Sequence, residues 1–264
     1  MKSVNPTARF AALVARPEAE IALDEAALVV AAHAYPDLDV AAELARIDRL
    51  VPDSIPRQDL DAWSHLMFTE LGFSGNVASY YDPQNSFLND VVGSRRGLPI
   101  TLSVVGIALA QRLDLTMVGI GMPGHFLLRS AEDDDVFVDP FAAGLRLDRA
   151  GCQERFHAVI GRDVAFSPGY LDPVGPRALL TRLLANLKSI FAHSGDSTSL
   201  EWVLDLRLTI PGVPLLERRD RARLRASAGR FGEAADELEE LAFALPDLAD
   251  DLEAEAIAAR ARLN

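Results

Sequence analysis

Among the side chains that do chemistry in proteins, His125 and Asp139 have the most distinctive setting in this chain. His125 follows the turn Pro123–Gly124 and opens an apolar run, and Asp139 closes the apolar run that begins at Val136. A histidine oriented by an aspartate forms the base half of a catalytic triad, because the carboxylate fixes the imidazole tautomer and the imidazole accepts a proton from a nucleophile. The alternative interpretation is a polar pair at the end of a sheet that serves only folding.

These two residues are expected on neighbouring strands of a hairpin. The segments 126–130 and 136–139 have the apolar and β-branched character of strands and are separated by an acidic turn. A favourable cross-strand charge pair sets the expected register. Because side chains alternate along a strand, this register puts three facing pairs on one face of the sheet: Arg129 with Asp135, Leu127 with Phe137, and His125 with Asp139.

A nucleophile for this pair would come from the start of the apolar helix expected over Pro99–Leu113. A helix N-terminus favours developing negative charge, but the first residues of this helix include no cysteine. The hydroxyls of Thr101 and Ser103 are the candidate replacements. Because these residues are two positions apart on a helix, at most one of them faces His125. The single cysteine, Cys152, follows the hairpin and is expected to be a small buried residue.

The composition argues against several classes of function. The chain of 264 residues has 39 acidic and 26 basic residues and a net charge of -13, which opposes binding to nucleic acids and to anionic membranes. One cysteine can form neither an internal disulfide nor a metal cage, so neither a metal nor a cofactor is expected. The first ten residues lack the pattern of a secretion signal, and no apolar run is long enough for a bilayer, so a cytoplasmic protein is expected.

The pattern of apolar residues predicts an α+β core. Residues 1–75 show helical spacing, and the segment 100–113 is apolar almost all round, which indicates a buried central helix. A strand at 115–121 and the hairpin follow, so that a small antiparallel sheet is expected to pack on this helix. Capping or ion pairing is the expected role of the polar residues that precede the helix: Asn85, Ser86, Arg95 and Arg96.

The segment 167–176 is rich in proline and glycine and predicts a domain boundary. Residues 1–170 are expected to form the first domain, and residues 176–264 an all-helical region. Two spacings in that region are typical of tetratricopeptide repeats: Gly195 and Gly229 are 34 residues apart, and Pro211 and Pro246 are 35 apart. An ordinary helical cap on the core is the alternative.

The helical region also concentrates charge. Arginines between residues 218 and 225 precede an acidic stretch at 233–240. These arginines either attract an acidic partner or pair within the chain.

Four runs, in this order, resemble the signature of a bacterial family: Asn85–Asn89, Arg95–Ser103, Gly119–Leu127 and Val138–Phe141. This is the SirB-type family of transglutaminase-like proteins with a tetratricopeptide tail, and the resemblance is strong over residues 71–147. It implies a papain-like fold and, from the wider superfamily, a Cys-His-Asp triad. His125 and Asp139 match the triad histidine and aspartate. The cysteine position falls near Pro99–Thr101, where this sequence has none.

Three functions remain open after this comparison. The first is a non-catalytic scaffold that binds a protein or peptide in the old cleft. The second is a hydrolase or acyltransferase that uses Thr101 or Ser103 with His125 and Asp139, although a hydroxyl is a far weaker nucleophile than a thiolate without strong activation. The third is a regulatory adaptor that acts through the helical tail. The missing cysteine favours the scaffold.

Overall fold

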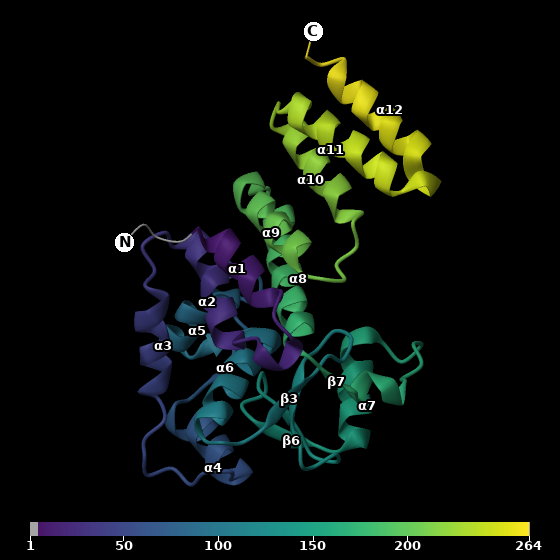
Figure 1. Ribbon diagram of the computed structural model, residues 1–264. Helices are drawn as coiled ribbons and strands as arrows, with labels where there is room; N and C mark the ends of the chain where they lie inside the picture. The colour runs from purple at the N-terminus through teal and green to yellow at the C-terminus, as the bar shows by residue number, and fades with distance from the viewer. Residues whose placement is uncertain (1–4, 264) are drawn as a thin grey trace. The chain divides into compact units, whose positions relative to one another are not determined.

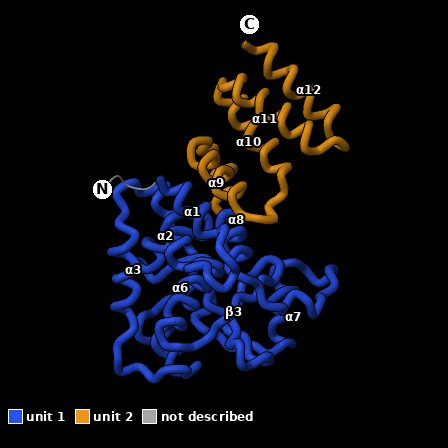
Figure 2. The backbone as a smooth tube through the Cα atoms, in the orientation of Figure 1, with its two compact units in different colours: residues 1–186 blue, residues 187–264 orange. Residues whose placement is uncertain are grey.

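The computed structural model describes residues 5–263 and forms two compact units, residues 1–186 and residues 187–264 (Figure 2). The division falls inside helix α8 (Pro176–Ser194), beyond the proline- and glycine-rich segment at which the sequence predicts a boundary. The predicted helical segment begins at residue 1, and its first four residues lie outside the described part. Each unit is described by itself below.

The first unit contains most of the helices and all of the strands assigned within residues 5–263 (Figure 1). Aspartate side chains begin several of these helices by accepting backbone N–H groups, as Asp39, Asp59 and Asp148 do. The helices that precede the sheet are α1 (Pro6–Val14), α2 (Leu23–Ala34), α3 (Val40–Asp48), α4 (Leu60–Ser64) with a π-helical continuation at His65–Glu70, α5 (Leu88–Ser94) and α6 (Pro99–Arg112). Short 3₁₀ turns lie at Glu18–Glu20, Pro83–Ser86 and Pro168–Leu171.

Helix α6 is the predicted central helix. Proline occupies its first position, where a backbone N–H would have no acceptor within the helix, so its absence costs no hydrogen bond. Every residue from Pro99 to Ala110 is buried, which explains why the sequence is apolar on all sides of this helix. The indole nitrogen of Trp63 donates to the carbonyl of Gly106 over 3.0 Å and ties α4 to the middle of α6.

The sheet has five antiparallel strands in the order β6-β5-β4-β3-β7. Their bounds are β3 (Met117–Ile120), β4 (Leu127–Ser130), β5 (Phe137–Asp139), β6 (Leu145–Leu147) and β7 (Pro173–Val174). The expected strands at 115–121, 126–130 and 136–139 are present as β3, β4 and β5, whereas β6 and β7 were not expected. A separate parallel pair joins β1 (Ser74–Gly75) to β2 (Arg96–Gly97) just before α6.

The predicted hairpin register is wrong by two residues. Leu128 faces Val138 and Arg129 faces Phe137, whereas the sequence argument placed Arg129 opposite Asp135. Arg129 instead forms an ion pair with Asp134 in the turn, so the charge that seemed to fix the register is satisfied locally. A shift of two keeps every side chain on its predicted face.

Helices cover both faces of this sheet. Leu128 approaches Gly106 of α6 on one face. On the other face, Leu127 and Phe137 pack with Cys152 and Phe156 of helix α7 (Arg149–Ile160), which lies beside the sheet in Figure 1. The arrangement confirms the predicted α+β class with a central helix and a small antiparallel sheet.

We expect Gly106→Ala to destabilise the first unit by about 1–3 kcal/mol, although alanine is the better helix former. A Cβ at this position would lie 2.6 Å from Leu128 Cδ1 and 3.1 Å from Trp63 Cζ2, so both side chains would have to move. Urea unfolding followed by circular dichroism measures the loss. The matched control is Gly232→Ala, a helical glycine with open space around its Cβ, which we expect to be neutral or stabilising; equal effects at both sites would contradict the packing argument.

The second unit is entirely helical in its described part. Its helices are the end of α8, α9 (Ser197–Thr209), α10 (Glu217–Ser227), α11 (Phe231–Ala244) and α12 (Ala249–Arg260), with a 3₁₀ turn at Pro246–Leu248. Alanines make up much of its core, among them Ala222, Ala234 and Ala256, and allow α10, α11 and α12 to approach closely. Gly229 adopts a φ of 80° between α10 and α11, a conformation that favours glycine. None of the helices within residues 5–263 has both the length and the hydrophobicity needed to cross a bilayer.

Candidate functional site

His125 and Asp139 are brought together by the turn before β4 and the end of β5. The His125 N–H donates to the Met122 carbonyl over 3.0 Å, and Gly124 takes a φ of 74° in this turn. Continuing the observed register beyond β4 places His125 level with Phe141 and diagonal to Asp139. Diagonal neighbours on one face are within reach of long or aromatic side chains, so the pair forms despite the register difference.

The two side chains form a buried close pair. His125 Nε2 lies 3.0 Å from Asp139 Oδ1, with His125 only 7% exposed and Asp139 fully buried. The Nε2–H direction lies off the line of a well-aligned hydrogen bond. The pair therefore has the separation, but not the alignment, of a histidine oriented by a carboxylate.

Asp139 also holds the backbone that follows it. Its Oδ1 accepts from the N–H groups of Phe141 and Ala142 over 3.0 and 3.1 Å, and its Oδ2 lies 3.0 Å from Arg155 Nη2 on α7. Burial raises the pKa of this carboxyl, but the interactions with His125, Ala142 and Arg155 outweigh burial and hold the pKa below its usual value of 3.8. Asp139, at the end of β5, thus contacts His125 just before β4, the turn that follows β5, and helix α7.

The candidate hydroxyl nucleophiles do not complete a triad. Thr101 and Ser103 are both fully buried in α6. Ser103 Oγ donates to the carbonyl of Pro99 over 2.8 Å, and Thr101 Oγ1 has no hydrogen-bond partner within residues 5–263. Asp139 lies on the α7 side of the sheet, as its contact with Arg155 shows. Neither hydroxyl is hydrogen-bonded to His125, which is the first geometric requirement for activation by a base.

The only cysteine is equally unsuited to chemistry. Cys152 is fully buried on α7 among apolar side chains. Burial, followed by the charges of Asp148 and Asp139, raises the pKa of its thiol to about 12. The thiol is therefore protonated at neutral pH, as expected of a small buried residue.

We expect Cys152 to resist iodoacetamide in the native protein at pH 8. Both its burial and its raised pKa suppress the thiolate, so labelling should be at least about 100-fold slower than in the urea-unfolded chain. Mass spectrometry of timed samples gives both rates. Native labelling as fast as unfolded labelling would contradict the buried position.

A row of aromatic rings leads from the buried pair to the surface. The rings of His125 and Phe141 are 6.3 Å apart, those of Phe141 and Tyr80 are 5.8 Å apart, and those of Tyr80 and Tyr81 are 5.3 Å apart. Tyr81 is 77% exposed. We call these four residues the aromatic row. Val159, half-exposed at the end of α7, lies against Gly124 beside His125.

Sequence reasoning missed several of these residues. Phe141 stands in the run Val138–Phe141, in which only the aspartate indicates chemistry, and the sequence favours packing over ligand stacking for Tyr80 and Tyr81. Arg155 had no sequence signal, because only the packing of α7 on the sheet brings it to Asp139. No group of three or more histidine, cysteine or carboxylate side chains within residues 5–263 is arranged to hold a metal ion.

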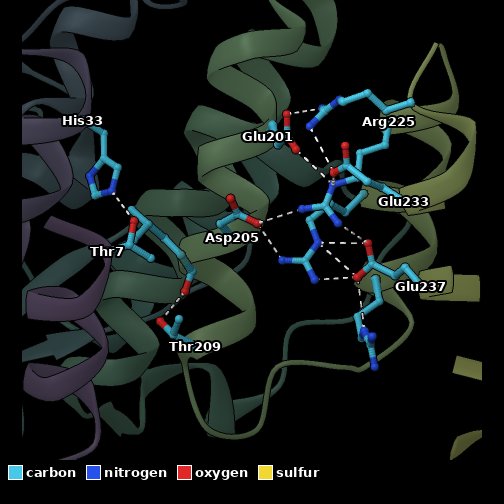
Figure 3. A network of polar contacts seen from close by, with 12 residues as sticks. Thr7, His33, Glu201, Asp205, Thr209, Arg225, Glu233 and Glu237 are labelled. Atoms are coloured by element: carbon cyan, nitrogen blue, oxygen red, sulfur yellow. Dashed lines mark hydrogen bonds and ion pairs between the residues drawn. The ribbon is translucent and has the colours of Figure 1, made fainter. Parts of the chain in front are cut away.

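The arginines of α10 pair within the second unit (Figure 3). Glu237 of α11, only 5% exposed, lies 3.0–3.2 Å from nitrogens of Arg218, Arg221 and Arg225. Arg219 and Arg223 both bind Glu255 of α12. Arg225 also reaches Glu201 of α9 over 3.0 Å. All five arginines are thus engaged by carboxylates of the same unit.

Comparison with known proteins identifies the family of the chain. A family model described as the transglutaminase-like superfamily matches residues 32–185, which include α6, the hairpin and both members of the His125–Asp139 pair. The chain belongs to the transglutaminase-like superfamily. No solved structure shows a significant match to this transglutaminase-like protein.

Its relatives include bacterial proteins described only as UPF0162 proteins. One, from Xylella fastidiosa (strain 9a5c), is 38% identical over 184 residues, which is 64% of each chain. Another, from Pseudomonas aeruginosa, is 32% identical over 182 residues, or 66% of this chain and 67% of that protein. F-box only protein 21 of Homo sapiens is 27% identical over 157 residues, which cover 56% of this chain and 24% of that protein. More than half of this chain therefore also has a similar segment within a much longer protein.

Proposed function

We propose that this transglutaminase-like protein is a non-catalytic scaffold that binds a peptide or protein segment at the aromatic row. Its family position supports a cleft inherited from an acyl-transfer fold, and its residues support the loss of that chemistry. The observation that carries the proposal is that neither Thr101 nor Ser103 is hydrogen-bonded to His125, while the only cysteine is buried elsewhere.

The His125–Asp139 pair has a role that needs no reaction. Asp139 is held by Arg155 and by two backbone N–H groups, so its charge is satisfied by the fold. A base that assists turnover needs a nucleophile within hydrogen-bonding reach. The hydrolase or acyltransferase alternative, with Thr101 or Ser103, lacks that contact.

Exposed aromatic and aliphatic side chains supply the binding surface. Tyrosine offers a large contact area at a low cost in conformational entropy, which is why it is enriched where proteins bind segments of other chains. Tyr81 and Val77 are 77% and 78% exposed in one loop, and Val159 lies against Gly124, the residue before His125. The Tyr80 hydroxyl, whose pKa is raised by partial burial, can donate to a peptide carbonyl.

The proposal also covers the branch of the superfamily and the repeat type of the helical tail. We assign the chain to the SirB-type branch and α10–α12 to a tetratricopeptide-like unit. Support for the tail comes from its consecutive helices, its alanine-rich core and the glycine turn at Gly229. Because the α10 arginines are paired internally, the tail offers an acidic partner little free positive charge, which favours the aromatic row over the tail as the main binding surface.

Catalysis and binding are tested separately. Wild type and His125→Ala are screened against peptide, ester and amide substrates, and we expect no turnover by either protein. Turnover by the wild type that disappears in the variant would overturn the non-catalytic assignment.

Binding is tested by selecting peptides from a random phage-displayed library on the full chain. We expect selected peptides to lose about tenfold or more in affinity for Tyr81→Ala, because an exposed aromatic anchor is removed. Val164→Ala, also an exposed apolar residue, is the matched control and should bind normally. Failure to select any peptide, or equal affinity for all three proteins, would refute a binding role for the aromatic row.

A further inference from the structure

The first turns of α8 pack on the segment that carries His125. Leu179 Cδ1 of α8 and Phe126 Cε1 both lie close to Gly119 of β3, at 3.1 and 2.8 Å from the position that a Cβ would take there. Phe126 is the residue after His125. Arg182 follows Leu179 by three residues, so it lies on the same side of α8 one turn further along. All of these residues belong to the first unit.

Arg182 is a half-buried arginine without a partner in the fold. Among residues 5–263, no carboxylate forms an ion pair with it, and its guanidinium makes no hydrogen bond. The chain has 39 acidic and 26 basic residues, so carboxylates are not scarce. Arg221 of α10, by contrast, is bound by two carboxylates. The five N–H donors of Arg182 therefore remain available to an acceptor from outside the chain.

The hydroxyl of Tyr80 is a second free donor near this charge. It forms no hydrogen bond within the described residues, and the Tyr80 ring lies 5.3 Å from that of Tyr81 and 5.8 Å from that of Phe141. Burial raises the pKa of the Tyr80 hydroxyl, the charge of Arg182 lowers it, and Tyr81 raises it. None of these causes is a carboxylate, so the charge near Tyr80 is positive although the chain carries a net charge of -13.

The loop that carries Tyr80 is held in place by hydrogen bonds. Asn85, expected from the sequence to cap a helix, is buried and instead donates to the carbonyls of Ser79 and Tyr80 over 2.6 and 3.2 Å. Asp82 caps the turn at Pro83–Ser86 by accepting from the Gln84 N–H over 2.9 Å. A donor on a fixed loop loses little conformational entropy when a ligand binds.

We propose that the segment held by the aromatic row carries an aspartate or glutamate whose carboxylate is bound by Arg182 and Tyr80. The inference rests on the proposed binding function and names the chemical class of its partner, an acidic peptide segment. A guanidinium is a planar fork that matches both oxygens of a carboxylate, and the Tyr80 hydroxyl adds a further donor. The negative charge elsewhere on the chain opposes this contact little, because charges more than about 8 Å away are largely screened at physiological ionic strength.

The acidic group is assigned to a side chain and not to the end of a chain. Proteins that recognise a C-terminal carboxylate capture it with successive backbone N–H groups. The two donors at this site are side-chain groups that belong to different parts of the sequence, a loop and α8. They suit a carboxylate that projects from the middle of a bound segment.

A pair of selections from one random phage-displayed library tests the class of peptide. One selection uses the full-length wild type and the other uses full-length Arg182→Gln. We expect acidic residues to be enriched in the wild-type pool and to stay at their library frequency in the variant pool. Arg182 has no partner to lose, so the variant should keep the melting temperature of the wild type.

Isothermal titration calorimetry with one peptide from the wild-type pool, synthesised with a C-terminal amide, measures the contact itself. Replacing its acidic residue by the corresponding amide should weaken binding to the wild type about tenfold and binding to Arg182→Gln less than about twofold. Arg182→Lys keeps the charge without the fork and should lose only part of the affinity. Arg49→Gln, at an exposed arginine that also lacks an ion pair within residues 5–263, is the matched control and should bind like the wild type.

The outcomes separate this inference from the proposed function. Selected peptides that lose affinity for Tyr81→Ala but bind Arg182→Gln as well as the wild type would overturn the acidic class and leave the binding function standing. A peptide that binds only with a free C-terminal carboxylate would overturn the assignment to a side chain. A library that yields no peptide on the wild type overturns both proposals.

Discussion

Replacing Asp139 with alanine is expected to lower the free energy of unfolding by about 3–5 kcal/mol. The carboxylate is fully buried, lies 3.0 Å from both His125 and Arg155, and accepts two backbone N–H groups. Its removal leaves a half-buried arginine and two part-buried N–H groups without their acceptor, and losing one partner of such a set costs more than losing an exposed pair. Urea unfolding at pH 7, followed by circular dichroism, measures the difference from the wild type.

Two variants and a pH series separate the causes. Asp139→Asn keeps an oxygen for Phe141 and Ala142, so we expect it to lose only part of that stability, and Asp163→Ala, at an exposed position, should be within about 0.5 kcal/mol of the wild type. Because the folded-state pKa of Asp139 is lowered, its charge stabilises the protein above the ordinary value of 3.8, and this contribution is lost as pH falls through the lower folded-state pKa. A wild type–Asp139→Asn difference that stays constant from pH 7 to pH 2 would contradict this account.

Glu237→Gln is expected to destabilise the second unit by about 2–4 kcal/mol. Arg218, Arg221 and Arg225 converge on this carboxylate, which is 5% exposed. The glutamine is nearly the same size, but it leaves three arginines with reduced compensation in a partly buried place. Hydrogen exchange resolved by peptide measures the loss in α10 and α11 and should leave α6 unchanged.

The control is Glu240→Gln on the same helix. Glu240 also binds Arg218, but it is 69% exposed, and exposed pairs contribute little. We expect a change below about 0.5 kcal/mol. If both variants lower protection equally, burial of Glu237 does not determine the strength of this network.

The sequence predicted the helices and the hairpin of the first unit because their periodic signals are local. The all-round apolar pattern of 100–113 appears as α6, and the strands of 126–130 and 136–139 appear as β4 and β5. Strands β6 and β7 are three and two residues long, too short to carry a period. Strand β7 pairs with β3 from more than fifty positions away, and no local pattern encodes that contact.

For the site, the sequence predicted which two side chains share a face of the sheet, but not the register of the strands that carry them. Alternation along strands placed His125 and Asp139 on one face even though the register was two residues off. The register failed because Arg129 had two equivalent acidic neighbours, Asp134 and Asp135, and the structure uses the nearer turn residue. Arg155 had no sequence signal of its own, and only tertiary packing brings Phe141, Tyr80 and Tyr81 into a row with His125.

The carboxylate of Asp139 fixes the N–H groups of the turn that follows β5, and this contact has an evolutionary consequence. If the chain is the non-catalytic scaffold proposed above, selection for a folded chain is sufficient to retain the aspartate. His125 can then remain beside Asp139 without any selection for catalysis. A search that recognises enzymes by a histidine and an aspartate at this spacing therefore collects proteins selected for a turn together with proteins selected for a reaction.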